Sequence, residues 1–341
     1  MHLRPNPHRR IGLDCPELRD VPFPSTDAAA PSALLTRCPA AAQTLLVDAV
    51  TLADELGISR LWIKDERARM GLGSFKALGA AYVIACDHAA GQSEGQTYVT
   101  ASAGNHGLSV AVGAAAFGAR SVVYLAAPVP ESFAERLRSI GAEVVRAGDD
   151  YEASMKAAAK AADDTGAILL SDSSWPGYLT RPHRLMEGYT VLMEETFAQI
   201  PEPPSHILLQ AGVGGLAGAA AAMARKEWGD GPEILVVEPE FAPALSDSIA
   251  AGRPAVTSGP ISDMGRLDCK EPSLIALKGL ARDADQFMTI TEAEGAHGAD
   301  TVARHGMAST PSGAAGLAGL MAMKRSATMR VLVILSEEPE S

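Results

Sequence analysis

Short apolar runs that alternate with helical patterns are the feature that most restricts the fold of this chain. The run Thr97–Thr100, for example, is followed by a loop at 101–107 and by helical spacing from Leu108 to Phe117. Strands that alternate with helices are typical of an α/β fold with a mostly parallel sheet. The runs expected to form strands are 60–64, 97–100, 121–125, 143–145, 167–170, 207–210, 234–238 and 330–335. Helices are expected at 44–56, 76–85, 108–117, 132–140, 151–163, 183–199 and in a segment that ends near 227.

The length of 341 residues allows two compact domains that share a cleft, or one large domain. Hydrophobic residues make up 47% and charged residues 21% of the chain, which is an ordinary globular balance. Residues 1 to about 45 are rich in Pro, Arg and Asp and have few periodic apolar positions. We therefore expect this segment to wrap over a domain that is formed elsewhere.

Lys76 stands between Phe75 and an alanine-rich run at 77–85, so we expect it on the first turn of a helix with its amine turned inward. Desolvation and a helix N-terminus both disfavour the ammonium form, which would leave the amine neutral enough to attack an aldehyde. A Schiff-base lysine requires such an amine. The competing interpretation is an ordinary lysine on an exposed helix face, and the neighbouring motifs must decide.

The segment Gly212–Gly218 lies between an expected strand and an expected helix. Several backbone N–H groups of such a turn point at one anion, and the helix dipole favours negative charge, which suits a phosphate. Tight packing alone is the competing interpretation. A dinucleotide site is a further alternative, because Glu238 ends the next strand where a ribose-binding carboxylate would stand, although GVGGLAG departs from GxGxxG.

The loop Ser102–Gly107 is a second turn from a strand to a helix. Its small residues expose backbone donors to a carboxylate, and the Asn105 amide is able to donate to a phenolic oxygen. An ordinary turn explains the same residues. His106 in this loop is expected to be structural rather than catalytic.

Lys76, the loop 102–107 and the loop 212–218, in that order, resemble the fold-type II pyridoxal-phosphate enzymes, the tryptophan synthase β and threonine dehydratase superfamily. The resemblance runs from about Leu34 onward. Within this superfamily the chain looks most similar to the diaminopropionate ammonia-lyases. The segments that carry this similarity are 64–67 (KDER), 71–76 (GLGSFK), 172–178 (DSSWPGY), 186–189 (MEGY) and 269–272 (CKEP).

The resemblance implies two three-layer αβα domains with twisted, mostly parallel sheets. Residues 1–80 and 186–341 would form a large domain that binds pyridoxal 5′-phosphate. Residues 81–185 would form a small, mobile domain that carries the loop 102–107. A homodimer is also implied by the resemblance.

The resemblance also implies roles for individual residues. Lys76 would hold the cofactor aldehyde as a Schiff base and move the α-proton, and Asp172 would act as a second acid or base, unless it is only a helix-capping or turn aspartate. Asn105 would contact the cofactor O3′, and Ser336 would face the pyridine nitrogen and leave it largely unprotonated. The phosphate would be held by Gly212, Val213, Gly214, Gly215 and Leu216. The substrate would be bound by Ser102, Ala103, Gly104, Asn105 and His106.

The implied reaction is α,β-elimination from a small L-amino acid with a β-amino or β-hydroxyl leaving group, which yields a 2-oxo acid and ammonia. Ala103 replaces an aspartate of the ammonia-lyase pattern, so activity on D-isomers is not expected. Lys270 replaces a glycine beside Asp268, and a different substrate would follow if these charges lined the cleft. An L-threonine or L-serine dehydratase is the alternative, and β-replacement, racemisation and cofactor binding without turnover stay open.

The net charge of −12 argues against nucleic acid or an anionic membrane as the main partner, and favours a small solute. Four cysteines are widely spaced, without CxxC pairs or metal-ligand spacing with histidine, so we expect reduced thiols and no metal site. The basic N-terminus lacks a continuous apolar region, and no apolar run is long enough to span a bilayer. We therefore expect a cytoplasmic protein.

Overall fold

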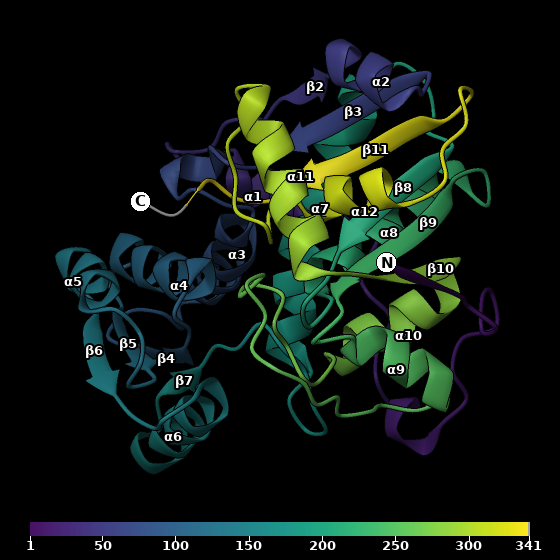
Figure 1. The fold of residues 1–341 in the computed structure, drawn as a ribbon. Coiled ribbons are helices and arrows are strands. Elements are labelled where there is room, and N and C mark those ends of the chain that lie inside the picture. The colour runs from purple at the N-terminus through teal and green to yellow at the C-terminus, as the bar shows by residue number, and fades with distance from the viewer. Residues whose placement is uncertain (340–341) are drawn as a thin grey trace.

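The computed structural model describes residues 1–339, which form two sheets with helices packed on both faces of each (Figure 1). The strands are β1 His2–Pro5, β2 Leu46–Asp48, β3 Arg60–Asp65, β4 Thr97–Ala101, β5 Arg120–Leu125, β6 Glu143–Arg146, β7 Ile168–Leu169, β8 His206–Gln210, β9 Glu233–Pro239, β10 Gln286–Ile290 and β11 Arg330–Leu335. The helices are α1 Ala29–Leu35, α2 Val50–Leu56, α3 Lys76–Ala89, α4 Asn105–Ala116, α5 Glu131–Ser139, α6 Tyr151–Thr165, α7 Thr180–Gln199, α8 Gly215–Trp228, α9 Ala244–Ala251, α10 Leu274–Asp283, α11 Glu292–Arg304 and α12 Ala315–Ala322. Short 3₁₀ turns lie at Pro16–Leu18 and Arg69–Gly71.

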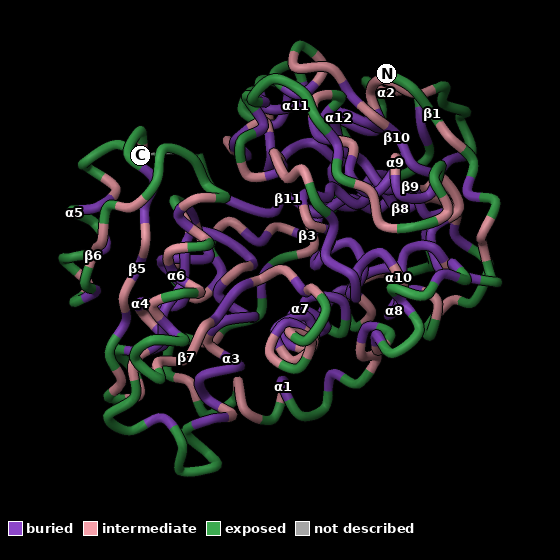
Figure 2. Tube along the Cα trace, turned by 90° about the horizontal axis from the view of Figure 1, so that it is seen from below, coloured by how far each residue is buried: buried purple, intermediate pink, exposed green. Residues whose placement is uncertain are grey.

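The larger sheet has seven strands in the order β1-β10-β9-β8-β11-β3-β2. Its five inner strands are parallel, whereas the edge strands β1 and β2 pair antiparallel with their neighbours. Successive side chains of a strand point to opposite faces of the sheet. Leu332 and Val333 of β11 therefore enter the hydrophobic cores on the two faces of the larger sheet. Helices α3, α7, α8 and α10 cover one face, and α2, α11 and α12 cover the other. The buried stretches run through the central strands β3, β8, β9 and β11 (Figure 2).

The smaller sheet has four parallel strands in the order β6-β5-β4-β7. Helices α4 and α5 pack on one face through Leu108 and Leu137, and α6 packs on the other through Ala158 and Ala162. Figure 1 shows this sheet beside the larger one, with α4 and α5 above it and α6 below it. All four strands lie within residues 81–185, whereas the strands of the larger sheet lie outside that range.

The α/β class and the mostly parallel sheets predicted from the sequence are confirmed, and each of the eight expected strands is present. The expected helix at 44–56 is wrong in its first part. Residues 46–48 form strand β2, and α2 begins only at Val50, because the backbone of Leu46 and Val47 pairs with β3. Apolar spacing alone does not distinguish a short edge strand from the first turn of a helix.

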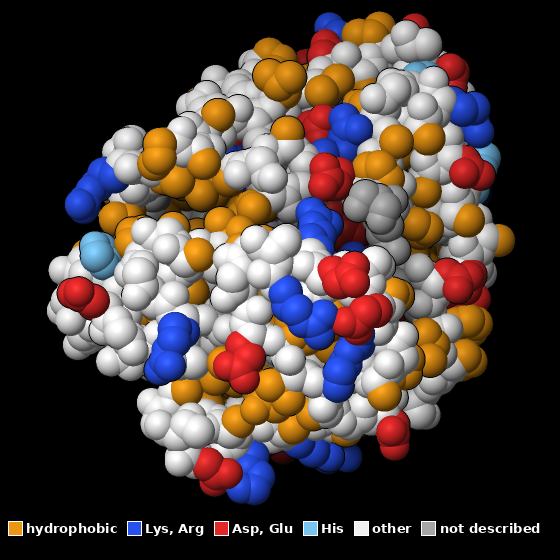
Figure 3. All heavy atoms as spheres, turned by 90° about the vertical axis from the view of Figure 1, so that its left-hand side faces the viewer, with side chains coloured by type: hydrophobic (Ala, Val, Ile, Leu, Met, Phe, Trp, Pro, Cys, Tyr) orange, Lys and Arg blue, Asp and Glu red, His pale blue; other side chains and the backbone are white. Residues whose placement is uncertain are grey.

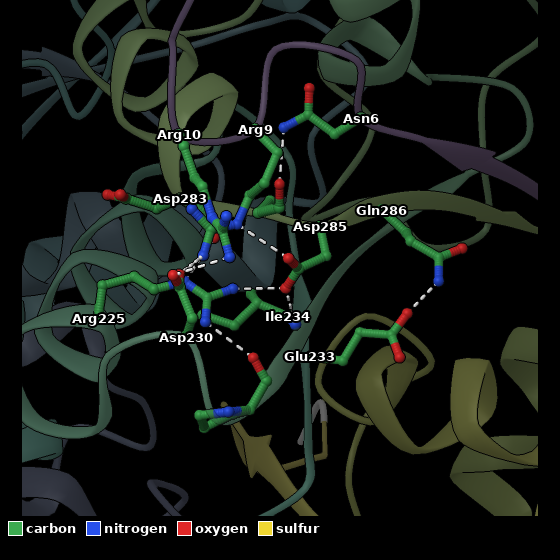
Figure 4. Close-up of polar contacts among 12 residues, drawn as sticks. Asn6, Arg9, Arg10, Arg225, Asp230, Glu233, Ile234, Asp283, Asp285 and Gln286 are labelled. Atoms are coloured by element: carbon green, nitrogen blue, oxygen red, sulfur yellow. Dashed lines mark hydrogen bonds and ion pairs between the residues drawn. The ribbon is translucent and has the colours of Figure 1, made fainter.

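The N-terminal segment was expected to wrap over a domain formed elsewhere, but it also supplies strand β1 at the edge of the larger sheet. After β1, arginine side chains of this segment form ion pairs with aspartate side chains of the larger sheet's half of the molecule (Figure 4). The Arg9 Nε atom donates to Asp285 Oδ1 over 2.8 Å, and Arg225 reaches the other oxygen of the same carboxylate. Arg10 pairs with Asp230 at 2.9 Å. Asn6, whose amide donates to the Ala281 carbonyl oxygen over 2.9 Å, and Leu18, which enters the core, attach the segment together with these ion pairs.

On the face drawn in Figure 3, lysine and arginine side chains are interspersed with aspartate and glutamate side chains. Among residues 1–339, no helix combines the length and the apolar composition that a membrane crossing requires.

Candidate active site

Lys76 is the first residue of α3, as the sequence predicted, and its amine points to Asp172. The Lys76 Nζ atom forms a short ion pair with Asp172 Oδ2, and the two side chains are 22% and 16% exposed. Lys76 follows β3 of the larger sheet, and Asp172 follows β7 of the smaller sheet. The pair therefore joins the two sheets at a place that solvent still reaches.

The charge of Lys76 differs from the sequence-based expectation. Burial favours the neutral amine, as expected, but the Asp172 carboxylate outweighs burial and raises the pKa of Lys76 above its ordinary value. Burial raises the pKa of Asp172, yet the Lys76 ammonium reverses this effect and holds that pKa below its usual range. The expectation of a neutral amine is therefore wrong for the free side chain. The amine rests as an ammonium ion that Asp172 neutralises.

The glycine-rich segment 212–216 connects β8 to α8, and Gly214 has the positive φ of 96° that glycine adopts without strain. A Cβ at Gly212 would lie 2.9 Å from Cys269 Sγ, and a Cβ at Gly214 would lie 3.0 Å from Ala276 Cβ. A Cβ at Gly215 would lie 4.0 Å from the Asp172 carbonyl oxygen, so the loop adjoins Asp172. The first N–H groups of α8 have no partner within the helix and are available to an anion.

The loop 102–107 connects β4 to α4, whose first residue is Asn105. The Ser102 hydroxyl accepts the Gly104 N–H over 3.2 Å and so fixes the turn. The buried His106 places Nε2 2.9 Å from the Leu170 carbonyl oxygen, and burial lowers its pKa, so the imidazole is neutral. This ring nitrogen contacts backbone, and a role of His106 in substrate binding stays a prediction.

Ser336 follows β11 and is buried beside Lys76, because its carbonyl oxygen accepts the Phe75 N–H over 3.2 Å. The next residue, Glu337, accepts a hydrogen bond of 2.6 Å from Asn105 Nδ2. The structure thus brings together the four features predicted from separate parts of the chain: Lys76 with Asp172, the glycine loop, the loop at Asn105, and Ser336.

Two charged residues at this site, Arg266 and Glu337, were not predicted from the sequence. Arg266 Nη1 donates to the Ala103 carbonyl oxygen over 3.0 Å, and Arg266 Nε lies 3.8 Å from Glu337 Oε2. Thr310 donates to the other oxygen of Glu337. Arg266 and Thr310 also line an adjacent hollow of about 410 Å³. No local motif marks Arg266 or Glu337, because both reach the site through contacts between distant segments.

Cys269 was noted as part of the CKEP segment and proves to adjoin the glycine loop. Its thiol is contacted by the Val213 N–H and lies in the field of Asp172 and Lys76. Burial, with a smaller contribution from Asp172, raises its pKa to about 12. The thiol is therefore neutral and packs against the loop rather than acting as a nucleophile.

Lys270 and Asp268 were considered as charges that would select a different substrate, but Lys270 pairs with Asp268 and with backbone carbonyl oxygens. Lys270 Nζ donates to the carbonyl oxygens of Phe241 and Pro260 over 2.8 and 3.0 Å, and to Asp268 Oδ1 over 2.6 Å. Lys270 and Asp268 thus hold this loop together. They supply no argument for a different substrate.

Glu238 was the residue that kept a dinucleotide site open. Its carboxylate is fully buried and accepts the N–H groups of Leu245 and Ser246 over 2.8 Å each, which caps the start of α9. Because the side chain is buried and already caps this helix, Glu238 is not placed to bind a ribose hydroxyl, which removes the support for a dinucleotide site.

These residues fit pyridoxal 5′-phosphate. Lys76 supplies the amine for an aldehyde, and the glycine loop at the start of α8 supplies a space without Cβ atoms and a set of N–H donors for a phosphate. The Tyr189 hydroxyl beside them is buried and lacks a hydrogen-bond partner within residues 1–339, which is expected where a polar group is meant to meet a ligand.

Comparison with known proteins agrees with this site. Residues 38–337 match the family model described as "Pyridoxal-phosphate dependent enzyme". The diaminopropionate ammonia-lyase of Salmonella typhimurium is 31% identical over 77% of this chain and 72% of its own length. The L-threonine ammonia-lyase of Thermotoga maritima is 24% identical over 74% of this chain and 60% of its own length.

A solved structure of the Escherichia coli diaminopropionate ammonia-lyase, in complex with an aminoacrylate–PLP azomethine reaction intermediate, superposes with a TM-score of 0.87 at 26% identity. The match covers 99% of this chain and 93% of that one. The resemblance seen in the sequence is thereby confirmed. The chain belongs to the family of pyridoxal-phosphate-dependent enzymes and groups within it with the ammonia-lyases.

Proposed function

We propose that this protein catalyses α,β-elimination from a small L-amino acid that bears a β-amino group, as in L-2,3-diaminopropionate, and releases a 2-oxo acid and ammonia. The observation that carries the proposal is the ion pair of Lys76 and Asp172 beside the glycine loop. Elimination needs a base for the α-proton and an acid for the leaving group, and this pair offers one of each.

Pyridoxal phosphate, when bound, supplies an electron sink that stabilises negative charge at the substrate α-carbon. The protein residues do the remaining work. The Lys76 amine, once deprotonated, takes the α-proton. The proton taken up by Lys76 passes across the ion pair to Asp172, which donates it to the departing β-amino group, so that ammonia leaves and both side chains regain their starting states. The two groups are brought into reach because they lie at the facing ends of the two sheets.

The loop 102–107 orients the substrate in this proposal. Its backbone N–H groups at the start of α4 bind the α-carboxylate, since the end of a helix with free N–H groups favours an anion. Asn105 would contact the cofactor oxygen, and Ser336 would face the ring nitrogen without supplying a charge. The hydrogen bond from Asn105 to Glu337 supports these positions because it fixes the orientation of the amide.

Ala103 supports an L-specific enzyme. Its side chain is a methyl group, and its carbonyl oxygen accepts from Arg266, so position 103 carries no carboxylate that would take a proton from the opposite face of the substrate. The related Escherichia coli enzyme has been solved in complex with D-serine, and activity with D-isomers is thus the point at which this chain is expected to differ.

The second candidate is a dehydratase of L-serine or L-threonine, favoured by the similarity to an L-threonine ammonia-lyase. One experiment separates the two. Purified, cofactor-loaded protein is assayed for 2-oxo-acid release with L-2,3-diaminopropionate, L-serine, L-threonine and the D-isomers. We expect the highest kcat/KM with L-2,3-diaminopropionate and at least about 10-fold less with its D-isomer. A higher kcat/KM with L-serine or L-threonine would establish the second candidate. Absence of 2-oxo-acid release from every substrate would refute both candidates.

Asp172→Asn is expected to lower kcat by about 10²- to 10³-fold, which is the usual contribution of a single general acid. The same change removes the charge that holds the Lys76 pKa above its ordinary value, so the neutral fraction of the amine at pH 7 rises. Cofactor incorporation, followed by absorbance, is therefore expected to be faster in the variant at pH 7.

The wild-type protein is expected to take up cofactor faster as the pH rises from 7 to 9, because deprotonation of Lys76 becomes more frequent. Asp164→Asn is the matched control, since Asp164 forms an exposed ion pair with Lys160 and should change neither rate. An Asp172→Asn protein with unchanged kcat would remove Asp172 from the mechanism.

We also propose that residues 1–80 and 186–341 form a large domain, of which 340 and 341 lie outside the described residues, and that residues 81–185 form a small, mobile one. The placement of the two sheets supports this division. A cytoplasmic homodimer completes the proposal, and sedimentation of the purified protein tests its oligomeric state.

A further inference from the structure

Tyr189 on α7 is buried at the floor of the candidate site. Its ring packs edge-on against Phe75, with 4.9 Å between the ring centroids, and only 1% of the residue is exposed. A Cβ at Gly79 would lie 2.6 Å from the Tyr189 Cε1 atom. The absence of a side chain at Gly79 therefore gives the ring its place, and α3 and Phe75 hold it there.

The position of the ring sets the position of the hydroxyl group. Lys76 and Gly79 are three residues apart on α3 and share one face of the helix, so the ring that covers Gly79 lies next to Lys76. At the opposite edge of the Tyr189 ring, the Cε2 atom lies 3.6 Å from the position that a Cβ at Gly215, the first residue of α8, would occupy. The hydroxyl group, which is attached between these two ring edges, therefore lies between α3 at Gly79 and the start of α8.

The hydroxyl group has no hydrogen-bond partner among residues 1–339. Buried polar groups are almost always paired, so an unpaired one in a ligand site indicates where a ligand atom belongs. Burial raises the pKa of Tyr189 and outweighs the opposite effect of the Lys76 charge, so the phenol stays protonated. It is a hydrogen-bond donor that is held in place before any ligand arrives.

We propose that the Tyr189 hydroxyl donates a hydrogen bond to the phosphate group of the cofactor at the start of α8. The glycine loop Gly212–Leu216 contains no Ser, Thr, Lys or Arg, so by itself it offers a phosphate only backbone N–H groups. Tyr189 adds the side-chain donor that this loop lacks. The inference rests on cofactor binding by this site and adds a residue to it.

The test compares cofactor-free wild-type protein with Tyr189→Phe, which keeps the ring and removes only the hydroxyl group. Binding of pyridoxal phosphate and of pyridoxal, which lacks the phosphate, is titrated by absorbance. We expect Tyr189→Phe to weaken pyridoxal phosphate about 10-fold, the effect of one hydrogen bond to a charged group, and to change pyridoxal by less than about 2-fold. The cofactor-free variant should be at least as heat-stable as the wild type, because no bond within the protein is lost.

Tyr82→Phe is the matched control. Tyr82 lies on α3, and its hydroxyl donates to Glu187 over 2.9 Å, so this change should leave the affinity for both ligands as it is. Equal weakening of pyridoxal and pyridoxal phosphate in Tyr189→Phe, or unchanged binding of both, would overturn the proposal for Tyr189 alone. Failure of the wild type to bind pyridoxal phosphate would instead overturn the function proposed for the whole site.

Discussion

Lys76→Ala is expected to lower kcat by at least about 10³-fold and to remove the visible absorption band of the bound cofactor. The reason is geometric as well as chemical. The Lys76 amine pairs with Asp172, which adjoins the glycine loop, so its loss removes the attachment point and the base together. Oxo-acid release and the absorption spectrum after dialysis against pyridoxal phosphate are the two measurements.

Lys76→Arg separates this chemistry from the structural part of the ion pair. The guanidinium group keeps the positive charge beside Asp172 but remains protonated, so it does not attach an aldehyde. We expect a folded protein that is as inactive as Lys76→Ala. Lys160→Ala, at an exposed position on α6, should retain full activity. Elimination by either Lys76 variant would show that another residue is the base.

Glu195→Ala is expected to lower the free energy of unfolding by about 3–5 kcal/mol, the usual effect of removing one partner from a buried ion pair. Glu195 on α7 pairs with Lys64 and with Arg69 at 2.7 Å each, and Arg69 also pairs with Glu66 at 2.7 Å. The side chains of Lys64, Arg69 and Glu66 are fully buried. Without Glu195, two buried cations would share one carboxylate. Urea unfolding followed by circular dichroism measures the change.

Glu194→Ala provides the control on the same helix. Glu194 is exposed, and its contact with Ser32 lies at the surface, so its removal should change stability by no more than about 0.5 kcal/mol. Glu195→Gln keeps the hydrogen-bonding shape but removes the charge, and we expect a loss between those of the other two variants. A loss below about 1 kcal/mol in Glu195→Ala would mean that water or repacking compensates the two cations.

Local patterns predicted most of what surrounds the site. The glycine loop, the start of α3 at Lys76 and the end of β11 before Ser336 follow from residues that are adjacent in sequence. Residues 64–67 (KDER) contributed to the resemblance, but the contacts of their side chains were not predicted. Lys64 and Glu66 serve a buried ion network with Arg69 and Glu195, and pairing between residues up to 131 positions apart leaves no local signal.

The elements that escaped prediction are those defined by contacts rather than by composition. Strand β1 is largely exposed, and its place is set by backbone pairing with β10. Between Glu238 and Arg330 the sequence suggested no element, although α9 to α12 and β10 fill that stretch. Arg266 lies in a loop there and reaches Ala103, which follows β4 of the smaller sheet. A single sequence does not reveal which distant backbone atom a long side chain will meet.

The ion pair between Lys76 and Asp172 has a consequence for how the enzyme is loaded. The Lys76 amine must lose its proton before it reacts. Through its ion pair with Asp172, the same amine also links the segment that follows β3 to the segment that follows β7. Neutralising Lys76 would remove one charged contact between those segments, whereas the hydrogen bonds from Asn105 to Glu337 and from Arg266 to the Ala103 carbonyl oxygen would remain. Loss of the Lys76 proton, which reaction with an aldehyde requires, therefore costs the protein one charged contact between the two sheets.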